Sequence, residues 1–184
     1  MFILGTGLRV SELCGLRWCD INDGEIYVNQ ITYCANIDGK HRRITSAPKS
    51  EAGIRNIPLN DKLQAILENQ RHAQCMDRIK AGAAWLGSEP GKGNQYIFAS
   101  AFGTPSDRSN ISRTFRACLK QSGLESRGVH ALRHTFASEG IHTIDIKTLS
   151  EILGHSDVAI TLRTYVHSDI ETKRKAMVAM SKII

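Results

Sequence analysis

The sequence predicts an α+β fold, in which one mostly helical domain carries a small three-stranded antiparallel sheet. Apolar residues recur at the spacing of amphipathic helices in several segments. Residues 25–59 are instead rich in β-branched and aromatic types, which is typical of strands. The 184 residues contain no repeat, low-complexity tract or linker, so we expect one domain over residues 1–184.

The first part of the chain is expected to hold a short helix and then the sheet. Residues 5–16 predict a turn followed by a helix with Val10, Leu13 and Cys14 on one face, and "WCDINDG" is interpreted as a loop. Strands are predicted at 25–34, 41–49 and 54–59. The segment "NIDGK" between the first two strands is a hairpin turn signal.

Helices are predicted for most of the remaining chain. Asn60 or Asp61 can cap the first of them, and Ser109 or Asn110 can cap the next, which ends at Gly123. The segment "YIFAS" between these two helices predicts a short extended piece. Further helices are expected at 130–140, 145–153, 157–167 and 170–182.

The composition excludes several classes of protein. No apolar run approaches the ~20 residues of a membrane span, and the apolar opening "MFILGTGLRV" is too short and lacks the basic segment of a signal peptide. Five cysteines without a CxxC pair indicate reduced thiols in a cytoplasmic protein. A net charge of +6 and a pI near 9.2 favour a polyanionic partner such as nucleic acid.

Polar residues recur at expected helix starts and turns, and His130 and Arg133 share a helix face at i, i+3. An imidazole beside a guanidinium is a suitable clamp for the non-bridging oxygens of a phosphate. Tyr165 follows a glycine–histidine turn, but it also continues a stripe with Val158 and Leu162. By that pattern alone Tyr165 is expected to be a core aromatic residue.

Four segments in order resemble the catalytic domain of the tyrosine recombinase (phage integrase) family. They are "TGLRVSELCGLRW", "PKSEAGIRNIPL", "HALRHTFAS" and "LGHSDVAITLRTYVH". The resemblance is strongest to integrases of phages and conjugative elements. It implies a site-specific DNA recombinase that cleaves and rejoins double-stranded DNA through a 3′-phosphotyrosine, without a metal or another cofactor.

The resemblance also implies a role for each matching residue. Tyr165 would be the nucleophile, and Arg9 and Arg133 would bind the non-bridging oxygens of the scissile phosphate. His155 would add a hydrogen bond to the same oxygens, Lys49 would protonate the 5′-oxygen that leaves, and His130 would assist proton transfer at the tyrosine. The supporting and DNA-contacting residues are Glu12, which would brace Arg9, and Arg42 and Arg43, which are candidates for phosphate contacts or plain solvated charges.

Several alternatives remain at this stage. Lys92 lies in "PGKGN", which is similar to a Gly-Lys-Gly sequence in the β-hairpin of some family members. Lys49 is favoured, because it is the lysine that is followed by a strand ending in "IPL". His134 is interpreted as structural, because the resemblance gives the functional role to His130. No zinc site is expected at this pair, because "HALRH" lacks the glutamate of a zinc protease. A type IB topoisomerase shares the chemistry, but the "LGH" spacing favours a recombinase. A truncated, non-catalytic DNA-binding or assembly module of the same fold is the alternative function.

The resemblance carries expectations about organisation as well. The N-terminal core-binding domain of the family is expected to be absent from these residues, and the tail at 168–184 is expected to be a helix. That tail would dock either on its own domain or on a neighbouring protomer. We expect a homotetramer on DNA, and a monomer or weak oligomer in its absence.

Overall fold

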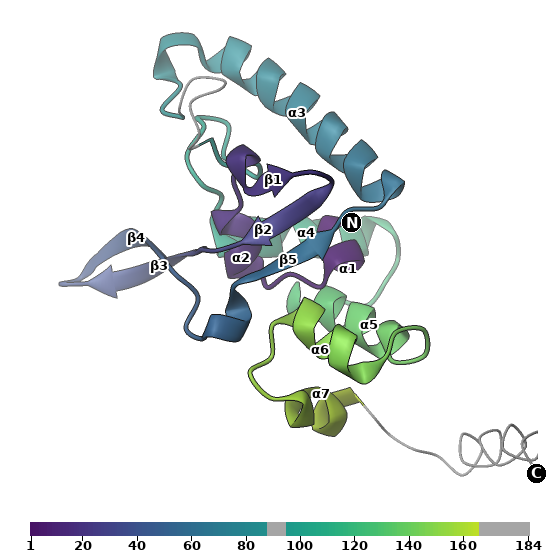
Figure 1. Cartoon of the computed structure of the whole chain (residues 1–184). Helices are drawn as coiled ribbons and strands as arrows, with labels where there is room; N and C mark the ends of the chain where they lie inside the picture. Colours follow the sequence, from purple (N-terminus) through teal and green to yellow (C-terminus); the bar gives the residue numbers. More distant parts are fainter. Residues whose placement is uncertain (88–94, 166–184) are drawn as a thin grey trace, which may run out of the picture.

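The computed structural model describes residues 1–87 and 95–165, and the side chains of the last segment up to Arg163. The predicted tail helix at 168–184, Lys92 and His167 lie outside the described residues. The α+β class is confirmed, with helices around two small antiparallel sheets (Figure 1). No helix among the described residues is long and apolar enough to cross a membrane.

Helices surround the N-terminal part of the fold and form all of its C-terminal part (Figure 1). The longest is α3, whose first turn is capped by the Asn60 side chain, which accepts a hydrogen bond from the backbone N–H of Leu63. The helices are α1 (Phe2–Thr6), α2 (Val10–Gly15), α3 (Asp61–Ala81), α4 (Arg108–Gln121), α5 (His130–Gly140), α6 (Ile146–Leu153) and α7 (Val158–Tyr165), with short 3₁₀ turns at Trp18–Asp20, Glu51–Gly53 and Gly82–Ala84.

A three-stranded sheet is present, but its strands differ from the predicted ones. Strands β1 (Ile21–Asn22), β2 (Glu25–Val28) and β5 (Arg55–Pro58) form it in the order β1-β2-β5, all antiparallel. β3 (Ile31–Ile37) and β4 (Lys40–Ser46) form a separate hairpin that projects from the body (Figure 1). The segment interpreted as a loop, "WCDINDG", therefore contains a 3₁₀ turn and β1.

The single strand predicted at 25–34 is interrupted because two side chains bond outside the ladder. Asn29 donates to Asp20 Oδ1 at 3.1 Å, and Gln30 donates to the carbonyl oxygen of Gly15 at 2.6 Å. These bonds turn the chain between β2 and β3. The hairpin turn was predicted correctly, since Asp38 and Gly39 both have positive φ between paired Ile37 and Lys40.

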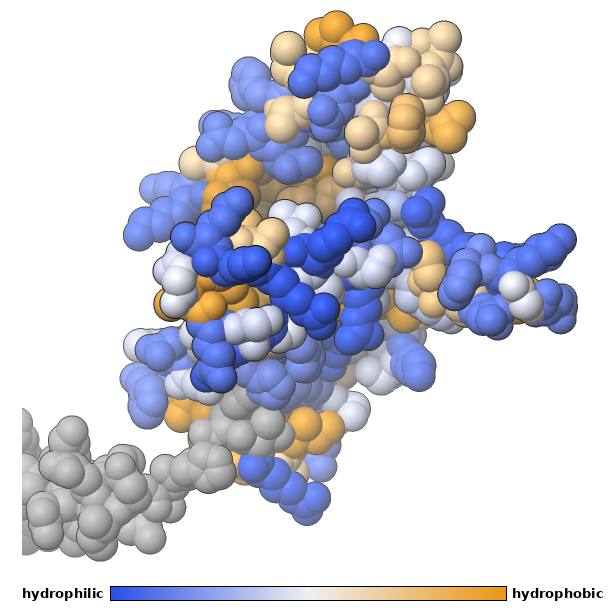
Figure 2. All heavy atoms as spheres, turned by 180° about the vertical axis from the view of Figure 1, so that it is seen from behind, coloured by the Kyte–Doolittle hydropathy of each residue, from blue (hydrophilic) through white to orange (hydrophobic). Residues whose placement is uncertain are grey.

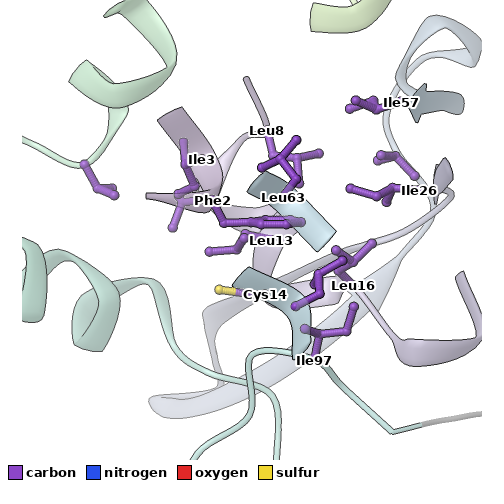
Figure 3. Packing of buried hydrophobic residues seen from close by; sticks show 14 residues of the cluster. Phe2, Ile3, Leu8, Leu13, Cys14, Leu16, Ile26, Ile57, Leu63 and Ile97 are labelled. Carbon is purple, nitrogen blue, oxygen red and sulfur yellow. The ribbon is translucent and has the colours of Figure 1, made fainter. Parts of the chain in front are cut away.

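Most buried apolar side chains form one cluster, to which α1, α2, the β2–β5 pair and α3 contribute (Figure 3). A smaller cluster, centred on Ala137, Leu149 and Leu153, joins α5 to α6. The predicted caps of α4 are wrong: Asp107, not Ser109 or Asn110, accepts the first backbone hydrogen bond. The residues of the larger cluster labelled in Figure 3 are Phe2, Ile3, Leu8, Leu13, Cys14, Leu16, Ile26, Ile57, Leu63 and Ile97.

Between the two clusters lies a close contact that only glycine allows. Gly7 ends α1 with φ of 66°, and a Cβ at this position would lie 2.6 Å from Cδ1 of Phe136. Its carbonyl oxygen is therefore brought directly against α5, where it can accept a hydrogen bond from a buried side chain.

Candidate active site

The candidate site is built around the C-terminal end of α6. Gly154 follows this helix with φ of 64°, and a Cβ there would lie 2.8 Å from Arg55 Nη1 and 2.9 Å from the carbonyl oxygen of Ala52. The last carbonyl groups of a helix lack partners within the helix. Here the carbonyl oxygens of Ile152, Leu153 and Gly154 accept hydrogen bonds from three arginines that come from separate segments.

Arg133 is the most buried of these arginines, with an exposed fraction of 2%. Its Nη1 donates to the carbonyl oxygen of Gly7 at 2.6 Å, and its Nη2 donates to that of Leu153, also at 2.6 Å. Nη2 lies 3.0 Å from Nε2 of His155. One guanidinium thus joins α5 to the end of α1 and to the turn after α6.

Arg9 lies at the start of α2 and is more open, with 37% of its side chain exposed. Its Nη1 donates to Glu12 Oε1 and to the carbonyl oxygen of Leu153, and its Nη2 donates to that of Gly154. Since a guanidinium has five N–H donors, two of them find no acceptor among the described residues. Those two donors are available to an anion.

The Glu12 carboxylate bonds two of the arginines, Arg9 and Arg55. Its carboxylate accepts from the backbone N–H of Arg9 at 2.8 Å and from both Nη atoms of Arg55, at 3.2 and 3.0 Å. Burial alone would raise the pKa of Glu12, but the hydrogen bond and charge of Arg55, together with those of Arg9, lower this pKa below its usual value. The carboxylate is therefore ionised at neutral pH.

Arg55 is a residue that sequence reasoning missed. Besides its two bonds to Glu12, its Nε donates to the carbonyl oxygen of Ile152 at 2.6 Å, and only 7% of its side chain is exposed. A signal was present in "RNIP", because residues i and i+2 of a strand share a face. Arg55 thus lies on the same face of β5 as Ile57, which is buried in the core.

His155 is held from both sides of its ring. An arginine can only donate, so Nε2 of His155 must accept the hydrogen bond from Arg133, and the ring proton is assigned to Nδ1. Nδ1 lies 2.8 Å from Oγ1 of Thr161, which then accepts this proton. Thr161 is completely buried, and it is a second residue that the sequence did not single out.

The pKa of His155 is lowered to about 4, first by burial and then by the charges of Arg133, Arg9 and Arg55, against an opposing effect of Glu12. The imidazole is therefore neutral at physiological pH.

His130 is the first residue of α5 and lies exposed, unlike Arg133 one turn later. Its ring packs edge-on against that of His134, with centroids 4.8 Å apart. Partial burial, followed by the charges of His134, Arg133 and Arg9, lowers the pKa of His130. His130 is therefore a neutral imidazole near the surface, which is the form that can accept a proton.

The remaining predicted site residues are Lys49, Arg42, Arg43 and Tyr165. Lys49 is exposed in the link between β4 and the Glu51–Gly53 turn, and it donates to no group in the part of the chain that the structure describes. Arg42 and Arg43 are exposed on β4. Tyr165 is the last residue of α7, and its side chain lies outside the described part.

Helix α7 packs differently from the predicted stripe. Val158 and Leu162, predicted on the buried face, are 37% and 40% exposed, whereas Thr161 is buried beside the ring of His155. The hydrogen bond to this ring turns a polar side chain inward, so the apolar pattern of α7 did not predict its buried face. Among the described residues, no group of three His, Cys, Asp or Glu is arranged to hold a metal ion.

A family model described as the phage integrase family matches residues 1–172 of the chain. The chain belongs to this family. It is 33% identical to a tyrosine recombinase XerC-like protein of Caldanaerobacter subterraneus, over all of this chain and 49% of that protein. It is 31% identical to the ICEBs1 integrase of Bacillus subtilis, over 88% of this chain and 42% of that protein.

The chain thus spans about half the length of these two relatives. Among solved structures, the Tn1549 transposon integrase in complex with transposon right end DNA superposes with a TM-score of 0.77 at 25% identity. This match covers 98% of the chain and 57% of the integrase. The expected family and fold are both confirmed.

We predict that Arg55→Met costs about 3–5 kcal/mol in the free energy of unfolding, because it removes one partner of a buried ion pair. The change leaves Glu12 buried with Arg9 alone and the Ile152 carbonyl without its donor. Urea denaturation measures this cost. Arg127→Met is the matched control, since its pair with Glu125 is 69% and 79% exposed and is worth about 0–1 kcal/mol. Equal losses in the two variants contradict the prediction.

We also predict that acid destabilises the folded chain through His155. Its pKa is lowered in the folded state, to about 4, so between pH 6.5 and 4 the unfolded chain binds a proton that the folded chain does not. The free energy of unfolding should therefore fall as the pH drops through this range. NMR titration of the imidazole C–H signals should give one midpoint near 4, which is absent in His155→Asn. A His155 midpoint near 6.5 would refute the assignment.

Proposed function

We propose that this chain is the catalytic domain of a site-specific DNA recombinase, which cleaves and rejoins DNA during the integration or excision of a mobile element. The observation that carries the proposal is the convergence of Arg9, Arg133 and His155 beside the helix that ends at Tyr165. The cluster holds three guanidinium groups but one carboxylate, that of Glu12, which binds Arg9 and Arg55, so it has an excess of positive charge. A phosphodiester is an anion that suits such a cluster.

In the first step that we propose, the Tyr165 oxygen attacks the phosphorus and the bond to the 5′-oxygen breaks. Arg9 has two N–H donors for the non-bridging oxygens of the phosphate. The positive charge of Arg133 further stabilises the negative charge that develops on the phosphate in the transition state. His130 takes part in removing the phenolic proton, and Lys49 donates a proton to the leaving 5′-oxygen. The products are a 3′-phosphotyrosine and a free 5′-hydroxyl.

Rejoining is the same step in reverse. A 5′-hydroxyl of another strand attacks the phosphotyrosine, and the phenol of Tyr165 leaves. One phosphodiester is exchanged for another, so the reaction needs no ATP. Exchange between two duplexes cuts four strands, and each cut uses one tyrosine. For this reason we propose a homotetramer on DNA, with a monomer or weak oligomer when DNA is absent.

The projecting hairpin supports DNA as the substrate. Lys40, His41, Arg42 and Arg43 follow one another along β4 and are all exposed. Figure 2 shows that the surface of this projection is largely hydrophilic. A basic strand extending from the body can lie along a phosphate backbone, and its contribution to affinity would weaken with salt. We further propose that the protein acts on DNA in the bacterial cytoplasm.

A covalent adduct tests the proposed chemistry. We predict that the chain, mixed with a pool of duplexes that carry a nick and a randomised crossover sequence, forms a protein–DNA species resistant to SDS. The nick lets the cleaved fragment diffuse away, which traps the intermediate. Tyr165→Phe should abolish the species and leave retention of the DNA on a filter unchanged. Retention of DNA by the wild-type chain without any adduct would instead support a non-catalytic binding module.

A second test addresses Lys49. We predict that Lys49→Ala slows cleavage of an ordinary phosphodiester by about 10²–10⁴-fold, the usual contribution of general acid catalysis. A substrate with sulfur in place of the bridging 5′-oxygen should restore the rate, because a thiolate leaves without protonation. Lys62→Ala, on the exposed surface of α3, is the control. If the sulfur substrate does not rescue Lys49→Ala, this lysine is not the general acid.

A further inference from the structure

Thr161 is unusual among the α7 side chains that the structure describes, because it is polar and completely buried. Its neighbours Ile160 and Leu162 are apolar and yet 43% and 40% exposed. A buried hydroxyl destabilises a protein unless it is hydrogen-bonded. The hydroxyl of Thr161 meets this requirement at Nδ1 of His155, at a distance of 2.8 Å.

The contacts on the other side of the ring fix the direction of this bond. Arg133 Nη2 lies 3.0 Å from Nε2 and has only hydrogens to offer, so Nε2 presents its lone pair. The ring proton is then on Nδ1, and Thr161 accepts it. In this arrangement Nε2 has no hydrogen to give to a phosphate oxygen, which is the role that the family resemblance implies for His155.

We propose that Thr161 is a positioning residue that lets His155 change tautomer when a phosphate binds, an inference that rests on the proposed function. A hydroxyl can both accept and donate. When Arg133 turns its N–H from the ring to the phosphate, the proton at Nδ1 passes to water and another from water arrives at Nε2. The ring stays neutral, Nε2–H donates to the phosphate oxygen, and Thr161 now donates to Nδ1.

This role also links the nucleophile helix to the phosphate site. Thr161 and Tyr165 belong to the same helix and are four residues apart, which is about one turn. The Nδ1 side of the His155 ring is therefore held only while α7 is packed against the end of α6. Groups on other elements that face the ring are charged, namely Arg133 on α5, Arg9 and Glu12 at α2, and Arg55 on β5. None of these can replace a neutral group that both donates and accepts.

Imidazole ¹⁵N NMR of the free chain tests the first half of the inference. The wild-type protein should show His155 protonated at Nδ1, and Thr161→Ser, which keeps the hydroxyl, should show the same. Thr161→Val should keep the proton at Nδ1, because Arg133 still donates to Nε2, but the Nδ1–H then loses its acceptor and its ¹⁵N signal should shift. Thr32→Val, a buried threonine bonded to Thr45 in the hairpin, should leave the His155 signals unchanged. A wild-type ring protonated at Nε2, or a His155 Nδ1 signal that is the same in Thr161→Val as in the wild type, overturns the proposal.

The covalent DNA adduct tests the second half. In the wild-type adduct the His155 proton should be at Nε2. The rate of adduct formation at saturating DNA should fall about tenfold in Thr161→Val and recover in Thr161→Ser, with the dissociation constant for DNA unchanged. A Thr161→Val variant that loses only affinity, or an adduct with the proton still at Nδ1, refutes the switch. If no wild-type adduct forms, the proposed function fails, whereas the free-state spectra still decide the hydrogen-bond assignment.

Discussion

The structure depends on how the carbonyl groups at the end of α6 are satisfied. These oxygens carry the negative end of the helix dipole and have no partners within the helix. Arg9, Arg55 and Arg133 supply the missing donors, and each comes from a different element. One set of hydrogen bonds therefore ends the helix and brings together the cations of the candidate site.

Glu12 balances this arrangement without neutralising it. The carboxylate is fixed by Arg55 from β5 and by the backbone of Arg9, so the Arg9 guanidinium is oriented while part of it stays exposed. A carboxylate that bound all the cations would remove the attraction for a phosphate. Without any carboxylate, the guanidinium groups would repel one another. The burial of Arg55 behind Glu12 leaves Arg9 as the guanidinium that faces solvent most openly.

Sequence reasoning identified the family and most of the residues that converge, because Arg9, Arg133 and His155 lie in motifs of fixed spacing. It missed Arg55 and Thr161, since a strand arginine and a helix threonine have many ordinary explanations. Arg55 is buried because it bonds Glu12, about 40 positions earlier in the chain. Thr161 is buried because it bonds one side of the His155 ring. The sheet was assigned wrongly in detail because the tertiary bonds of Asn29 and Gln30 interrupt a segment of high β propensity.

The contacts of the site also join opposite ends of the chain. Arg9 binds Gly154, 145 residues later, and Arg133 binds Gly7, 126 residues earlier. A growing chain carries Arg9 long before it carries the carbonyl acceptors of Leu153 and Gly154, so no nascent fragment that lacks α6 can assemble the cluster. The arrangement makes the cluster one of the last features to form during synthesis, because contacts of such separation require most of the chain to be ordered first. A chain that lacks α6 therefore lacks the acceptors that group these arginines.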